Sequence, residues 1–132
     1  MEEKNLQKII KYWQKSAEHN YETFVYLFKG KRYADALFFG HITLEKILKA
    51  HVVKDTKKPA PKIHDLVRLA KLTKLNLNKN QLTYLKIVNR FNMRARYPDI
   101  KLNFYKYCTK EYTTKHYQKI SKLYQELCQR LK

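Results

Sequence analysis

The chain has 132 residues, and its 29 lysine and arginine residues outnumber the 11 aspartate and glutamate residues to give a formal net charge of +18. This length favours a single domain, 1–132, whose core is large enough to fold without disulfide bonds. Two cysteines, Cys108 and Cys128, exclude a disulfide framework, and the longest weakly polar run is far shorter than the roughly 20 residues of a membrane span. The composition therefore predicts a cytoplasmic protein with no membrane segment.

The first half of the chain has the apolar spacing of helices. Apolar residues recur every three or four positions over about 3–28, which predicts an amphipathic helix. Gly30 is expected to end this helix in the left-handed conformation. The same spacing then predicts a second helix over about 34–54.

Two prolines interrupt the helical pattern after the second helix. Pro59 and Pro61 predict an extended connector. A shorter helix is expected over about 65–73, where Asp65 would lie at the positive N-terminal end.

The second half of the chain predicts two more long helices. Asn78 is expected to cap a helix over about 79–96, and Gln81 would complete a capping box. Tyr97-Pro98 would stop that helix, and the last helix is expected from about 110 to the C-terminus. Together these elements predict an all-α, antiparallel up-down bundle of four long helices and one short helix.

Five short motifs occur in one order along the chain. They are Trp13 with Ala17; Leu27, Gly30 and Tyr33; His41 with LEKILKA at 44–50; Pro61 with HDL at 64–66; and RYPD at 96–99. In this order they resemble the prokaryotic HEPN domain over roughly 10–130. The resemblance implies a helical bundle that forms homodimers and occurs beside small nucleotidyltransferases, in toxin–antitoxin and defence systems.

The nuclease members of the HEPN superfamily carry an arginine followed about four to six residues later by a histidine, a pair that can orient a 2′-hydroxyl and stabilise charge on the phosphate. No arginine of this chain has a histidine at that distance; the arginines are Arg32, Arg68, Arg90, Arg94, Arg96 and Arg130. The sequence therefore predicts no catalytic residue, although an arginine and a histidine from different segments remain free to meet in space.

One charged residue is expected inside the bundle. At about 100° per residue, Glu45 falls at the centre of the apolar stripe of its helix, where an unpaired carboxylate is costly. Arg96 falls on the inward face of the helix over 79–96, together with Leu82, Leu85, Asn89 and Met93. A guanidinium can hold a carboxylate with two hydrogen bonds, so Glu45 and Arg96 are predicted to form a structural clamp.

The alternative interpretation of the same corner is a polar pocket for a nucleotide or another anion. Its candidate residues are Tyr33, His41, Glu45, Arg94, Arg96 and Tyr97. No pair of histidines has the spacing that places two metal ligands on one helix face, so no metal site is predicted. With only Gly30 and Gly40 the chain has no glycine-rich phosphate loop, and no cofactor is predicted.

These observations predict a non-catalytic HEPN-domain protein that acts as a binding subunit. The expected partners are a second copy of the chain and a small nucleotidyltransferase in a two-component, toxin–antitoxin-like system. Two alternatives stay open: an RNase toxin with a non-standard site, and a basic module that binds a nucleotide or RNA, weakly and with steep salt dependence.

Overall fold

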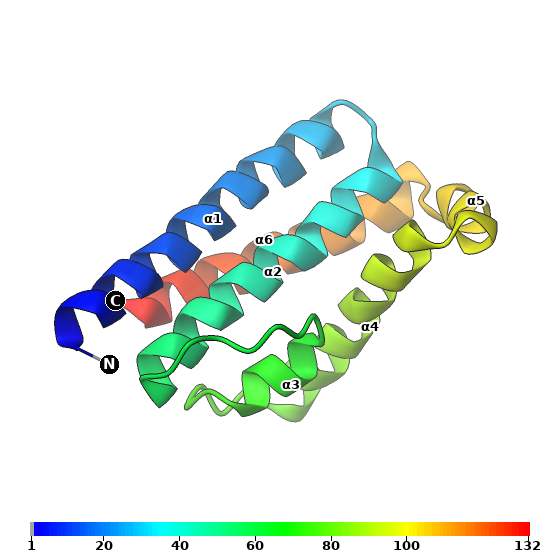
Figure 1. Ribbon diagram of the computed structural model, residues 1–132. Coiled ribbons are helices and arrows are strands. Elements are labelled where there is room, and N and C mark those ends of the chain that lie inside the picture. The colour runs from blue at the N-terminus through cyan, green and yellow to red at the C-terminus, as the bar shows by residue number, and fades with distance from the viewer. Residues whose placement is uncertain (1) are drawn as a thin grey trace.

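The computed structural model describes the backbone of residues 2–132, and the side chains of these residues except 95, 96, 98, 99 and 101. The described residues form six helices and no strand: α1 Glu3–Lys29, α2 Tyr33–Thr56, α3 Leu66–Lys71, α4 Lys79–Arg96, α5 Pro98–Tyr107 and α6 Lys110–Leu131. The long helices run side by side, both termini lie at one end of the bundle, and α5 projects at the other end (Figure 1). The all-α bundle prediction is confirmed. None of the described helices combines the length and the apolar character needed to cross a membrane.

Helix α2 lies at the centre of the bundle. It contacts α1, α3, α4, α5 and α6, and 15 of its 24 residues are buried. A helix buried on most of its circumference has little amphipathic character, which is why both apolar and polar residues of α2 lie inside. The polar ones therefore need partners within the protein.

Aromatic rings join α1 to α6. The ring of Tyr117 stacks on Phe24 and Phe28 with centroid separations of 4.9 and 3.9 Å, and Tyr21 stacks on Tyr124 at 4.5 Å. These rings pack against the core, as their helical spacing predicts.

Gly40 allows α1, α2 and α6 to approach closely. A Cβ atom at this position would lie 2.8 Å from Cδ1 of Ile120 and 3.0 Å from Cε1 of Phe24. Both distances are shorter than ordinary van der Waals contacts, so the packing of three helices depends on the missing side chain.

The end of α1 differs from the prediction. Gly30 has φ −81°, and its N–H still donates to the Tyr26 carbonyl. The left-handed residue is Lys31, with φ 64°, and the Arg32 N–H closes the turn on the Leu27 carbonyl. The left-handed residue that ends α1 thus lies one position after Gly30, whereas the sequence predicted it at Gly30 itself.

Both predicted helix starts in the middle of the chain are confirmed. The Asp65 carboxylate accepts hydrogen bonds from the N–H groups of Val67 and Arg68 at the start of α3. Asn78 and Gln81 form a reciprocal capping box at the start of α4.

Helix α5 was not predicted. Pro98 is its first residue, where the fixed φ and the missing N–H of proline are well tolerated. The segment gives little periodic signal because Phe104 is buried while four of its other apolar residues are exposed. Proline was therefore interpreted as a stop although it begins a helix.

The inward face of α4 also differs from the prediction. Met93 is 59% exposed, and the buried side chains are Leu85, Val88, Phe91 and Asn92. The buried face is rotated from the predicted one because Phe91 packs on Phe104 of α5, a helix that was not predicted from the sequence.

Candidate functional site: a buried polar network on α2

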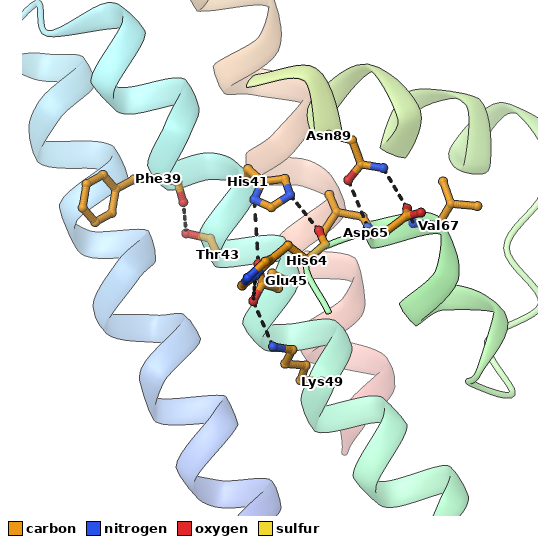
Figure 2. Close-up of polar contacts among 10 residues, drawn as sticks. Phe39, His41, Thr43, Glu45, Lys49, His64, Asp65, Val67 and Asn89 are labelled. Carbon is orange, nitrogen blue, oxygen red and sulfur yellow. Dashed lines mark hydrogen bonds and ion pairs between the residues drawn. The ribbon is translucent and has the colours of Figure 1, made fainter. Parts of the chain in front are cut away.

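Glu45 is the centre of a buried network of charged and polar side chains (Figure 2). Its carboxylate lies 3.0 Å from the ammonium of Lys49, one turn further along α2, and both residues are 6% exposed. Nδ1 of His64, whose side chain is 58% exposed, lies 3.1 and 3.2 Å from the two carboxylate oxygens and so connects the buried Glu45 to the surface. Because a carboxylate accepts, His64 carries its proton on Nδ1. The buried charge thus has two hydrogen-bonding partners.

His41 joins this network to the proline-containing connector. Its Nε2–H donates to the main-chain carbonyl of His64 over 3.0 Å, and its Nδ1 lies 3.9 Å from Glu45. Burial lowers the pKa of His41, and the carboxylate of Glu45 opposes this shift. In the neutral ring Nδ1 can only accept a hydrogen bond, and the nearby Glu45 carboxylate has no hydrogen to donate, so this buried atom is left without a hydrogen-bond partner among the described residues.

Asp65 and Asn89 extend the network to α3 and α4 (Figure 2). The Asn89 amide donates to the Asp65 carboxylate over 2.9 Å, and its oxygen accepts from the Leu66 N–H over 3.0 Å. Helix α1 contributes the Trp13 ring, over which the ammonium groups of Lys46 and Lys49 lie 5.2 and 5.3 Å from the centroid. The network therefore connects four helices and the connector.

A small cavity of about 260 Å³ lies beside the network. Its lining residues are His41, His64, Asp65, Asn89, Asn92 and Met93. Among the described side chains this lining includes a carboxylate and no lysine or arginine, while the side chain of Arg96 is not among those described. Among the residues that the structure describes, no group of three metal-ligating side chains is assembled.

The six residues predicted to form a pocket are only partly brought together in the described part of the structure. Of these six, His41 and Glu45 lie close to each other. Tyr33 packs on Phe28 and lines a separate cleft of about 420 Å³ with Lys31, Arg32, Asp35, Tyr105 and Cys108. Arg94 lies over the Phe104 ring at 5.9 Å, and Tyr97 is exposed at the end of α4.

The predicted Glu45–Arg96 clamp falls outside what the structure describes, because the side chain of Arg96 is not among the described ones. The clamp stays a prediction. Lys49 and His64 were not predicted as partners of Glu45, although the sequence carries a signal for each. Glu45 and Lys49 have the i, i+4 spacing of a helical ion pair, and His64 begins the HDL motif.

Two further buried histidines are held in structural hydrogen bonds. Nε2–H of His51 donates to the Leu127 carbonyl over 2.8 Å, and burial lowers the pKa of this ring. Nδ1 of His116 lies 2.9 Å from the Tyr84 hydroxyl. Burial, together with two neighbouring lysines, lowers the pKa of His116 to about 4, while burial raises the pKa of Tyr84, so the hydroxyl donates to the neutral ring.

Comparison with known proteins identifies a family. No curated protein and no solved structure matched the chain. The profile of the HEPN domain matches residues 10–131, which is nearly the whole chain and includes every member of the α2 network. Four residues of the motifs that carry the resemblance, His41, Glu45, His64 and Asp65, lie in the α2 network. The match over residues 10–131 shows that the chain belongs to the HEPN domain family.

Proposed function

We propose that the protein is a non-catalytic HEPN-domain binding subunit whose protein partner, a small nucleotidyltransferase, docks on the α4–α5 corner. The observation that carries this proposal is a concentration of exposed apolar side chains. Six large ones, each between 43% and 67% exposed, lie within 15 residues of the chain: Met93, Tyr97, Ile100, Leu102, Tyr105 and Tyr107. Grouped apolar surface of this kind marks interaction sites.

Three of the five histidines are poorly placed for RNA cleavage, which favours a binding role. A general acid or base must reach the substrate, whereas His41, His51 and His116 are each at most 5% exposed and hydrogen-bonded within the protein. The other two, His19 and His64, are exposed, and Nδ1 of His64 is hydrogen-bonded to the Glu45 carboxylate. Arg130 lies close enough to His51 to lower its pKa. However, its guanidinium donates to the Leu75 carbonyl over 2.7 Å, so each member of this pair has a structural partner.

The test asks first whether a neighbouring reading frame encodes a small nucleotidyltransferase, and then whether that protein, once purified, associates with this one. Leu102→Asp should weaken the complex at least about tenfold, because Leu102 is the most exposed of the six and a charge there would be buried against the partner. Leu72→Asp is the matched control, since Leu72 is also exposed but lies after α3. The control should bind like the parent protein.

Two results would overturn the proposal. One is the absence of a complex, or a Leu102→Asp variant that binds as tightly as the parent. The other is metal-independent cleavage of a mixed RNA pool that disappears in a folded His41→Ala or Arg96→Ala variant. Light scattering of the protein alone is expected to show a homodimer; if Leu102→Asp dissociates it and leaves the nucleotidyltransferase complex intact, the corner serves self-association instead.

A further inference from the structure

A second surface feature lies away from the α4–α5 corner. The start of α4, with its cap, and the middle of α6 line an open cleft of about 390 Å³. Its lining residues are Asn78, Asn80, Gln81, Tyr84, Lys119, Lys122, Leu123 and Glu126. Nothing in the α2 network or in the proposed partner surface uses these side chains.

The cleft is positively charged. Lys119 and Lys122 are exposed on one face of α6, and neither makes an ion pair within the described part of the chain. The single carboxylate in the wall, Glu126, accepts a hydrogen bond from the Gln81 amide over 3.0 Å. Helix α4 contributes no acidic residue over its whole length. Two lysines therefore face the cleft with little opposing charge, a setting that attracts carboxylates or other anions.

The other walls suit a peptide. Asn80 is an exposed amide in the first turn of α4, able both to donate and to accept hydrogen bonds, as a peptide main chain requires. Leu123 and the Tyr84 ring supply apolar contact between the lysines and the amides. A segment with alternating acidic and apolar side chains would match this combination of walls.

A nucleic acid strand matches the cleft less well. Sequence-tolerant binding of single strands relies on aromatic faces that are free to stack on bases. The Tyr84 ring is stacked on His116, with centroids 5.8 Å apart and planes 13° apart, and the Lys119 ammonium lies 5.4 Å from its centroid. Its hydroxyl is also bound to His116.

We infer that the cleft between α4 and α6 binds an acidic peptide segment of a partner protein, with Lys119 and Lys122 pairing with its carboxylates. The inference goes beyond the proposed function, because it concerns a different surface and a different recognition chemistry. It is tested with the protein alone, so its failure would leave the nucleotidyltransferase complex unaffected.

The experiment measures fluorescence anisotropy of a labelled peptide made of Glu-Glu-Leu repeats. The parent protein should bind it, and Lys119→Gln/Lys122→Gln should lower the affinity at least about tenfold, because two charge-assisted contacts are lost. The matched control is Lys11→Gln/Lys15→Gln, which removes two exposed charges one turn apart on α1. The control should bind within about twofold of the parent, and the charge-preserving Lys119→Arg/Lys122→Arg variant should bind more tightly than Lys119→Gln/Lys122→Gln.

Three outcomes would overturn the inference. Equal losses in the cleft variant and the α1 control would mean that diffuse charge, not the cleft, holds the peptide. Equal binding of a Gln-Gln-Leu peptide would remove the role of the carboxylates. A single-stranded RNA that displaces the peptide and loses affinity in the cleft variant alone would make the cleft a nucleic-acid site.

Discussion

Helices α2 and α5 distribute polar and apolar groups in opposite ways. In α2 the charges of Glu45 and Lys49 are inside the bundle and held by hydrogen bonds. In α5 the side chains of Ile100, Leu102 and Tyr107 are outside and exposed. The two helices therefore differ in role. The buried charges of α2 determine how the helices pack on one another, whereas the exposed apolar side chains of α5 indicate where another molecule binds.

The largest effect is expected from breaking the ion pair of α2. Glu45→Gln removes the charge that compensates Lys49 and should lower the free energy of unfolding by about 3 to 5 kcal/mol, as for other buried pairs that lose one member. Chemical denaturation measures this change. Glu22→Gln, at an exposed position of α1, is the control and should stay within about 0.5 kcal/mol of the parent.

The same position tests the clamp that the sequence predicts. If Arg96 also contacts Glu45, a double-mutant cycle of Glu45→Gln and Arg96→Gln should give a coupling energy above about 0.5 kcal/mol. Additive effects would remove Arg96 from the network. A Glu45→Gln protein as stable as the parent would show instead that the network contributes nothing to stability.

A smaller effect is expected at the close contact of α2 with its neighbours. Gly40→Ala should cost about 1 to 3 kcal/mol, because the added methyl group would overlap the side chains of Ile120 and Phe24. The loss should shrink in an Ile120→Val background, which removes the atom nearest to the new methyl group. Gly30→Ala is the matched control, since its Cβ would meet the Tyr26 carbonyl at 3.4 Å and its φ of −81° suits alanine. An equal loss at both glycines would contradict the overlap and point to a general intolerance of substitution.

The buried histidines of α2 give the bundle a dependence on pH. Burial lowers the pKa of His41 and His51 in the folded state below the usual 6.5. The unfolded chain therefore binds these protons first, so stability should be complete above about pH 6.5 and fall as the pH drops below it, by up to about 1.4 kcal/mol per pH unit for each proton. Denaturation between pH 7.5 and 5 would measure this slope.

His51→Gln isolates one of these protons. Its amide can still donate to the Leu127 carbonyl but does not titrate, so the slope below pH 6.5 should become shallower. An unchanged slope would show that His51 takes up its proton without cost in the folded protein. Replacing His19, an exposed histidine of α1, by Gln is the control and should leave the slope unchanged.

The smallest effect on folding is expected at α5. Leu102→Ser should change the free energy of unfolding by less than about 0.5 kcal/mol, because this side chain already faces solvent in the free protein. Thermal unfolding checks the value. A large loss would mean that Leu102 is part of the core, and the contrast between the two helices would disappear.

Most of the fold could be predicted from the sequence because its signals are local. Spacing of apolar residues locates the long helices, and Asp65, Asn78 and Gln81 mark helix starts through side chains that bond to nearby N–H groups. Helix α5 was not predicted because most of its apolar residues are exposed, so they do not show the regular spacing of a buried helix face.

The site was harder to predict because its contacts join distant segments. The carboxylate of Glu45 could be recognised as a buried charge from its place on α2, but its bond to His64 depends on how the connector returns across the bundle. The prediction that Met93 faces inward was wrong for a similar reason, since the orientation of α4 depends on its packing against α5.

The single tryptophan of the chain gives the buried network a spectroscopic signal of its own. The indole of Trp13 lies under the ammonium groups of Lys46 and Lys49, and Lys49 is the partner of Glu45. Indole emission depends on nearby charge, so its wavelength should respond when Lys49 loses its carboxylate even in a protein that stays folded. The protein thus carries an intrinsic fluorophore whose emission distinguishes rearrangement of the ion pair from unfolding of the bundle, without any added label.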